Sequence, residues 1–219
     1  MALPARPYAV EDFADLLKLR AAPFIPMPME NVSELGSGEF LTADMGPTLY
    51  QAACETAPMP NAEAHGLMAL IQALGGSKEC FYLPDYMRLY PAADPDGSIL
   101  AASAPTIHTI GGDRRTMRIT GLPAGYVITR GDYIAVDYGS PSRRALIKAA
   151  ETVTASGAGL TPSFAVSYPI GPGVTTTLAV ILKKPAAKVK MVPGTLSISP
   201  VDILNAVISF TARQTTSAG

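Results

Sequence analysis

Two histidines, His65 and His108, are the side chains best suited to proton transfer near neutral pH. His65 lies beside the apolar stripe of a predicted helix, and His108 lies among small residues with no carboxylate next to it in the sequence. Neither belongs to a motif that pairs it with a nucleophile, because the chain has no Gly-x-Ser-x-Gly elbow and no Cys–His signature. The sequence therefore predicts no catalytic residue, although groups distant in sequence can still meet in space.

The acidic residues predict structural roles. Asp94-Pro95-Asp96-Gly97 resembles the start of a calcium loop, but the further ligands and the closing glutamate are missing, which favours a turn stabilised by aspartate. Asp132 follows a glycine at a strand entrance, where we expect its carboxylate to bind local backbone. Asp137 alternates outward in its strand, towards solvent. A hydrolase built on Asp132 and Asp137 is the least favoured alternative, and the pattern predicts no metal site.

Cysteine and glycine spacing gives no sign of a cofactor. Cys54 and Cys80 are the only cysteines, and two widely spaced thiols predict buried free side chains, with a bridge between neighbouring strands as the alternative. Gly36-Ser37-Gly38 and Gly157-Ala158-Gly159 lack the strand-to-helix setting and the Lys-Ser/Thr ending of a phosphate-binding loop. We therefore expect neither a metal nor an organic cofactor.

The chain carries little charge. It has 219 residues, of which 16% are charged, and a formal net charge of −1, so it lacks the basic footprint of a nucleic-acid-binding protein. Basic pairs at Arg114-Arg115, Arg143-Arg144 and Lys183-Lys184 are typical of solvated turns, and if they cluster in space they can meet an acidic partner or DNA. A nearly neutral, apolar-leaning surface favours self-association over an isolated chain.

The beginning of the chain lacks the pattern of a signal peptide, and no apolar run approaches the length of a bilayer span. We therefore expect synthesis and folding in the cytoplasm and no membrane partner.

The elements that would position any site are mostly strands. Between residues 114 and 182, short runs alternate apolar and polar side chains and end at Gly- and Pro-rich turns, which is typical of half-buried antiparallel strands in a small barrel or sandwich. The runs are Arg114–Thr120, Tyr133–Tyr138, Arg144–Thr154, Phe164–Tyr168 and Val174–Leu182.

The region before this unit predicts a short helix, an extended segment and a hairpin. Glu11–Arg20 can form the helix, and the prolines of Ala21–Met29 enforce an extended arm, which we expect to cover its own core rather than a neighbouring subunit. Glu39–Ala43 and Leu49–Thr56 are the predicted hairpin strands, with the turn at Asp44–Pro47.

The strongest helix signal is at residues 61–74, with Asn61 as N-cap, one apolar stripe and Gly75-Gly76 at its end. This helix is expected to pack on a sheet that contains Glu79–Leu83. We predict a mainly β fold: a first β-sandwich domain of residues 1–92 with this helix, completed by residues 184–219, and an inserted small antiparallel β-barrel or sandwich of residues 93–183. Two domains in tandem are the alternative.

The order of elements and turns resembles the distal tail proteins at the tail tip of long-tailed, siphovirus-like phages. The resemblance covers most of residues 39–192. It is carried by Leu41–Tyr50 continuing through Thr56–Met59 to Gly75-Gly76, by Phe81–Asp85 with Tyr90-Pro91, and by Gly121–Tyr126 with Arg130–Tyr133 and Ala155–Gly159.

The resemblance implies a non-enzymatic structural protein with a tube-like β domain. Such proteins form a ring, commonly a homo-hexamer, that joins the tail tube protein to hub or baseplate proteins, with a lumen through which DNA passes without specific binding. The location would be the virion tail, assembled in the cytoplasm of the bacterial host. The alternatives are another virion structural protein (tube, tail-completion or decoration) and a module, formed by residues 114–182, that binds host-surface glycans.

Overall fold

The computed structural model describes residues 6–217. Within that range most ordered segments are β strands, and the regular helix is α1 (Asn61–Gln72). The predicted mainly β sandwich class with a packed helix is therefore confirmed.

A large antiparallel sheet joins strands from both ends of the chain. Its central order is β1-β3-β16-β14-β5, with β2 added to β3 and with β4 and β15 added to β16. The strands are β1 (Leu19–Ala21), β2 (Phe24–Glu34), β3 (Phe40–Thr56), β4 (Met59–Pro60), β5 (Phe81–Pro84), β14 (Ala186–Met191), β15 (Ser197–Pro200) and β16 (Asn205–Gln214). Because β16 pairs with β3 through residues 51–55, the end of the chain is built into the centre of the sheet.

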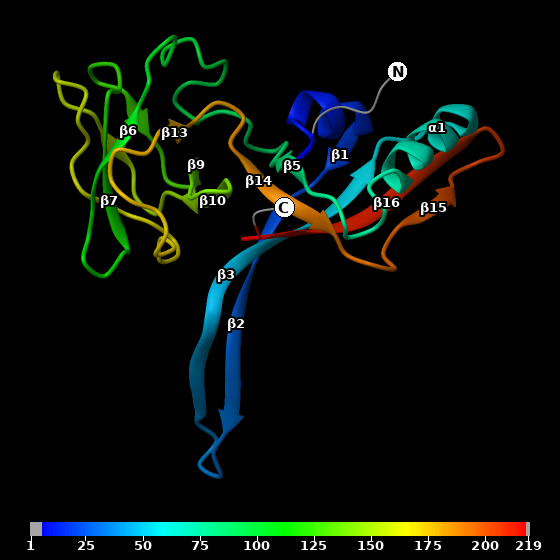
Figure 1. The fold of residues 1–219 in the computed structure, drawn as a ribbon, viewed down its shortest axis with the longest axis horizontal. Coiled ribbons are helices and arrows are strands. Elements are labelled where there is room, and N and C mark those ends of the chain that lie inside the picture. Colours follow the sequence, from blue (N-terminus) through cyan, green and yellow to red (C-terminus); the bar gives the residue numbers. More distant parts are fainter. Residues whose placement is uncertain (1–5, 218–219) are drawn as a thin grey trace.

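Three smaller antiparallel sheets lie between residues 106 and 181 and form the second part of the molecule, on the left in Figure 1. They pair β10-β9-β13, β12-β7-β6 and β11-β8. Their strands are β6 (Thr106–Ile110), β7 (Thr116–Thr120), β8 (Val127–Ile128), β9 (Tyr133–Tyr138), β10 (Arg143–Lys148), β11 (Val153–Thr154), β12 (Phe164–Ala165) and β13 (Val180–Ile181). We call residues 100–182 the barrel part.

Each part has its own apolar core, and the two cores touch. The core of the barrel part is formed by residues 100–182 and includes Ile119, Val136 and Phe164, each of them fully buried. Tyr133 and Leu146 instead pack into the core of the large sheet. The domain boundaries at residues 92/93 and 183/184 stay a prediction.

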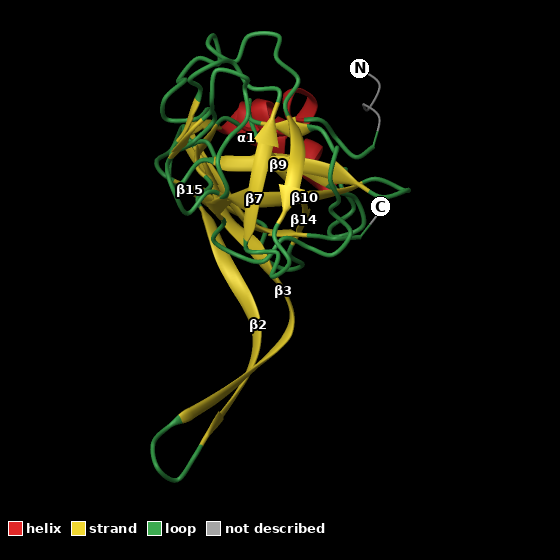
Figure 2. Ribbon diagram, turned by 90° about the vertical axis from the view of Figure 1, so that its left-hand side faces the viewer, coloured by secondary structure: helices red, strands yellow, loops and turns green. Residues whose placement is uncertain are grey.

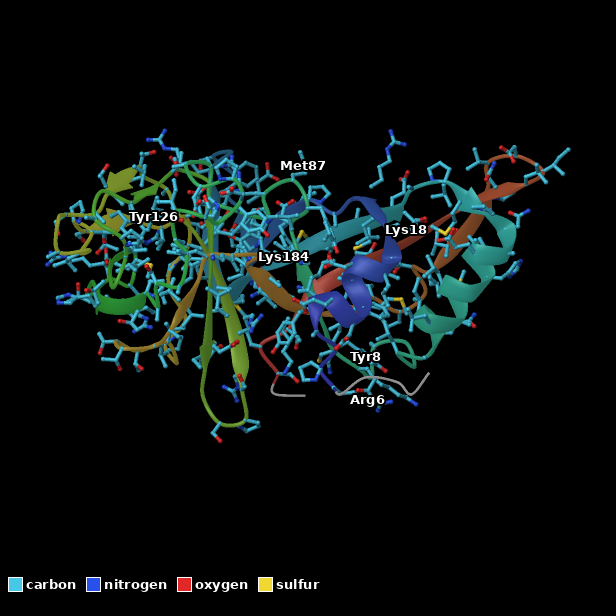
Figure 3. All side chains as sticks on the ribbon, turned by 90° about the horizontal axis from the view of Figure 1, so that it is seen from above. Arg6, Tyr8, Lys18, Met87, Tyr126 and Lys184 are labelled. Atoms are coloured by element: carbon cyan, nitrogen blue, oxygen red, sulfur yellow. The ribbon has the colours of Figure 1, made fainter. Side chains whose placement is uncertain are left out.

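Polar contacts fix the two places where the chain passes between the parts. Asp132 of the barrel part accepts hydrogen bonds from the Arg88 guanidinium and the Ala92 amide. Where the chain returns from the barrel part to the large sheet, the Lys184 ammonium group donates a hydrogen bond to the Asp15 carboxylate at 3.0 Å. Figure 3 shows Lys184 at this junction and Tyr126 within the barrel part. The barrel part is therefore held in a defined place beside the sheet.

The N-terminal region is shorter in helix than expected. Two short helical turns, η1 (Val10–Ala14) and η2 (Asp15–Leu17), are followed by β1, which replaces the end of the predicted helix Glu11–Arg20. The two turns bury Phe13 and Leu17 in the core of the large sheet. The helical conformation ends there because Lys18 adopts a left-handed backbone conformation with φ +50°.

The helix α1 lies beside β16 and buries Ala64 and Ile71. The prediction of Asn61 as its N-cap is wrong, because the cap position belongs to Pro60 and the Asn61 side-chain Nδ2 donates to the Ile203 carbonyl at 3.0 Å. Asn61 thereby ties the helix to the loop between β15 and β16. The helix ends at Gln72 with Ala73 as its C-cap, earlier than the predicted residue 74, and Gly75 and Gly76, both with positive φ, lie in the turn that follows.

The most prominent feature is a long hairpin of β2 and β3 that leaves the body of the molecule, as Figures 1 and 2 show from two directions. Its turn is Leu35–Glu39, where the Gly38 amide donates to the Leu35 carbonyl and Gly38 has φ +84°. The predicted turn at Asp44–Pro47 is wrong. Gly46 and Pro47 lie within β3. Gly46 pairs with Met29, and Pro47 lies opposite Pro28 where the pairing register shifts; such a bulge accommodates residues without an amide donor.

The expectation that Ala21–Met29 covers its own core is also wrong for most of its length. The extended conformation is present, and Phe24 is buried. Ile25, Met27 and Met29 are exposed because they lie on the part of β2 that leaves the body. The apolar side chains of this segment are therefore exposed on the surface of the chain.

Candidate interaction surface

The histidines do not assemble a site. His65 is exposed on α1 and His108 is exposed on β6. Neither side chain has a hydrogen-bond partner among residues 6–217. Neither histidine is therefore positioned for proton transfer by a neighbouring group of the described residues.

The two carboxylates of the hydrolase alternative are engaged in structural contacts. Asp132 is fully buried and accepts from the Thr129 amide at 2.8 Å, as predicted, and also from Arg88 and Ala92. Asp137 is not simply turned to solvent, because both of its oxygens accept hydrogen bonds from Arg144 at 2.6 Å. These contacts leave neither carboxylate directed at a cleft.

The segment Asp94–Gly97 is the aspartate-stabilised turn that its sequence predicts. The buried Asp94 accepts from the amides of Ile99 and Leu100, each at 3.0 Å, and from the Tyr126 hydroxyl at 3.3 Å. Burial, and then the Asp94 charge, raise the pKa of Tyr126 above its ordinary value. In the described part of the chain, no three His, Cys, Asp or Glu side chains gather as they would around a metal ion.

Both cysteines are buried free thiols, which confirms the prediction. Burial raises the pKa of Cys54 to about 12, and burial also raises the pKa of Cys80. Both thiols are therefore protonated and inert near neutral pH.

The projecting hairpin, defined here as residues 25–49, exposes apolar side chains on both of its faces. Phe40 is 65% exposed and Met45 is 70% exposed, and the neighbours Phe40 and Leu41 point to opposite faces of the strand. The exposed apolar side chains are Ile25, Met27, Met29, Val32, Leu35, Phe40, Leu41 and Met45. Sequence reasoning missed this surface because it placed the turn inside β3.

The edges of the projecting hairpin are as open as its faces. β16 pairs with β3 only as far as Gln51, and from Phe40 to Leu49 the described pairing of β3 is with β2 alone. A two-stranded hairpin without a packed face is marginal in water, and an unpaired strand edge is a template for another chain. Since contiguous exposed apolar surface marks interaction sites, the projecting hairpin has the features of a docking element.

A cleft of about 720 Å³ lies between the base of the projecting hairpin and the barrel part. On the hairpin side Glu30 and Asp44 line it, and on the barrel side Arg115 and Arg143 line it. Its remaining lining includes Tyr138, Tyr168 and the loop Pro169–Gly173. The cleft thus has one acidic wall, one basic wall and an aromatic, proline-rich floor.

The loop of the cleft is held rigidly in place. Arg114 donates to the carbonyls of Ile170 at 2.6 Å and Val174 at 2.7 Å, and also to that of Gly171, so its guanidinium is committed to the loop. A Cβ at Gly173 would lie 2.7 Å from the Tyr138 ring, so glycine alone permits this close approach. The basic pair Arg114-Arg115 is therefore divided between a structural side chain and one turned to the cleft.

A second apolar surface lies at the opposite end of the large sheet, in the loop between β15 and β16. Ile203 is 93% exposed, and Val201 and Leu204 are also exposed. Two separate apolar surfaces at different ends of one chain favour contacts with more than one neighbour.

No helix among residues 6–217 combines the length and apolar character that crossing a bilayer requires. Comparison with models of known protein families gives no match, and comparison with curated proteins finds no significant relative.

Proposed function

We propose that the chain is the subunit of a self-assembling structural ring, the adaptor ring at the tip of a phage tail. The observation that carries the proposal is the projecting hairpin, which leaves the body of the molecule (Figure 2) and whose exposed apolar side chains belong to neither core. The assignment to a distal tail protein rests on the order of motifs in residues 39–192. In this role the ring links the tail tube to hub or baseplate proteins in the virion and acts by geometry rather than catalysis.

The energetic case for assembly rests on the apolar side chains of the projecting hairpin. Fully burying a side chain such as Phe40 or Leu41 contributes roughly 1.5–3 kcal/mol. Several such side chains lie within one short segment, and the open strand edges add backbone hydrogen bonds when a neighbour docks. These contributions together are of the size that a stable protein interface requires.

The arrangement favours a ring over a two-fold dimer. The projecting hairpin and the apolar loop around Ile203 are different surfaces at different ends of the molecule. Head-to-tail contact between different surfaces produces a closed ring when the rotation between copies closes. A tube, tail-completion or decoration protein shares this composition, and the number of copies in the assembly separates these alternatives.

The test is the mass of the purified full chain in solution, measured by light scattering over a range of concentrations. The proposal predicts a discrete multiple of the chain mass of 22.8 kDa, commonly six copies. Phe40→Ser should shift assembly to a concentration about tenfold higher or more. Met87→Ser, at a side chain that is 74% exposed and lies outside the projecting hairpin, is the matched control and should leave assembly unchanged. Equal effects of the two variants would refute the role of the hairpin.

A further inference from the structure

Charge is divided unequally along the chain, although the total is nearly zero. The projecting hairpin and the remainder of β3 contain acidic residues and no lysine or arginine. These acidic residues are Glu30, Glu34, Glu39, Asp44 and Glu55. The hairpin is therefore an apolar element with charge of one sign.

The basic wall of the cleft has the opposite sign. Arg115 and Arg143 are exposed, line the cleft and form no ion pair within the described part of the chain. Glu30 and Asp44 on the facing wall also form no ion pair with described residues, so the two walls do not neutralise each other across the gap.

The outer half of the projecting hairpin fits this cleft in chemistry. Its turn carries Glu34 immediately before Leu35 and Glu39 immediately before Phe40. The floor of the cleft offers Tyr138 and proline-rich backbone to an apolar side chain. Charge and apolar groups on the hairpin therefore match the wall and the floor of the cleft.

We infer that this cleft receives the hairpin turn, Glu34–Leu41, of a second copy of the chain. Glu34 and Glu39 of that copy meet Arg115 and Arg143, and its Phe40 packs on the floor of the cleft. The chain's own turn does not supply this contact, because the cleft is lined by the base of the hairpin and the hairpin carries its turn away from the body of the molecule (Figures 1 and 2).

This inference rests on the proposed self-assembly and names its donor and acceptor surfaces. Because a copy donates its turn and accepts another at its cleft, the contact propagates head to tail. Charge of one sign on the turn also disfavours the contact of turn with turn.

The test exchanges the two charges between two full-length variants. Arg115→Glu/Arg143→Glu gives the cleft the sign of the wild-type turn, and Glu34→Arg/Glu39→Arg gives the turn the sign of the wild-type cleft. Each variant alone brings like charges together, and we expect each to need a protein concentration about tenfold higher or more for half-assembly than the wild type needs. Mixed in equal amounts, the acidic turn of the cleft variant meets the basic cleft of the turn variant. The basic turn of the turn variant likewise meets the acidic cleft of the cleft variant, so the mixture should assemble as the wild type does.

The matched control for the cleft variant is Arg20→Glu/Lys78→Glu, which makes the same change in net charge as Arg115→Glu/Arg143→Glu but at two exposed residues outside the cleft. It should assemble as the wild type does. Thermal unfolding of every variant verifies that the changes, all at exposed positions, leave the fold intact.

Several results would overturn the inference. If the wild type assembles and the cleft variant assembles equally well, the cleft is not the acceptor, while the proposed self-assembly stands. If folded variants fail to assemble alone and also fail when mixed, pairing between turn and cleft is wrong. If the wild type stays a single chain at every concentration, the proposed function and this inference fail together.

Discussion

The Asp132 carboxylate connects the barrel part to the segment that leads into it, and its removal should destabilise the fold strongly. Asp132 is fully buried and accepts from the amides of Thr129 at 2.8 Å and Ala92 at 3.0 Å. It also accepts from Arg88 at 3.1 Å. Asp132→Ala leaves the two amides without an acceptor.

The expected magnitude follows from these three contacts. The two hydrogen bonds are partly buried, and each amide left without its acceptor costs roughly 1–3 kcal/mol. The Arg88 side chain is 36% exposed and regains water, so its contribution is small. The free energy of unfolding should therefore fall by about 3–5 kcal/mol in Asp132→Ala, and by less in Asp132→Asn, which retains one acceptor oxygen.

Urea unfolding followed by circular dichroism measures this change, and the melting temperature should fall by about 10 °C. The control is Asp12→Ala at an exposed aspartate, which should change the free energy by less than about 1 kcal/mol. A loss below about 1 kcal/mol in Asp132→Ala, equal to that of the control, would refute the role of Asp132 as a structural link.

Three further predictions concern backbone geometry and titration. Gly159→Ala should lower the free energy of unfolding by at least about 2 kcal/mol, because its φ is +72° and its Cβ would lie 2.1 Å from the Leu122 carbonyl oxygen. Gly157→Ala, with no atom within 4 Å of the new Cβ, is the control and should be neutral by the same urea titration. Cys54, whose pKa burial raises to about 12, should resist a thiol reagent at about pH 8 until urea unfolds the chain; rapid labelling of the native protein would contradict its burial. Burial raises the pKa of Tyr126 above its ordinary 10.0, so the unfolded chain releases this proton at a lower pH than the folded chain does. The free energy of unfolding should therefore fall as pH rises above 10. A free energy of unfolding that does not change with alkaline pH, with phenolate absorbance unshifted, would be the contrary result.

The strands of the barrel part follow only in part from the sequence, in which alternation is a local signal. Phe164–Tyr168 is a strand only at Phe164–Ala165, and β8 lies outside the predicted runs. Tyr133–Tyr138 was predicted as a strand and is β9 with the same bounds. The run Val174–Leu182 is a strand only at Val180–Ile181, since the turns before it satisfy the backbone by other contacts. Apolar alternation indicates which side chains are buried more reliably than it indicates how long a strand is.

The projecting hairpin was misplaced for a physical reason. Gly46-Pro47 is a strong turn signal when the partner of the strand is unknown, and here it lies in a bulged stretch opposite Pro28 and Met29. The rules that predict helices and turns from sequence assume that apolar side chains are buried in the chain's own core. In this hairpin the apolar residues are exposed, and no local pattern distinguishes that outcome.

The cleft has no signal of its own in the sequence. Its lining residues Glu30, Asp44, Arg115 and Arg143 come from four separate elements or turns. The basic pairs were noted as groups that can meet an acidic partner, but their approach to the acidic hairpin depends on the placement of the barrel part. Such placement is set by long-range contacts, among them the one made by Asp132.

The central claim is that copies of this chain assemble through the projecting hairpin. The most direct measurement is negative-stain imaging of the purified full-length protein, with class averages compared between the wild type and Phe40→Ser. If the proposed assembly is correct, the wild type forms closed rings with a central hole and one fixed number of subunits, and the variant loses them at the same concentration. Single particles of one chain in both samples, or rings that persist unchanged in the variant, would contradict it.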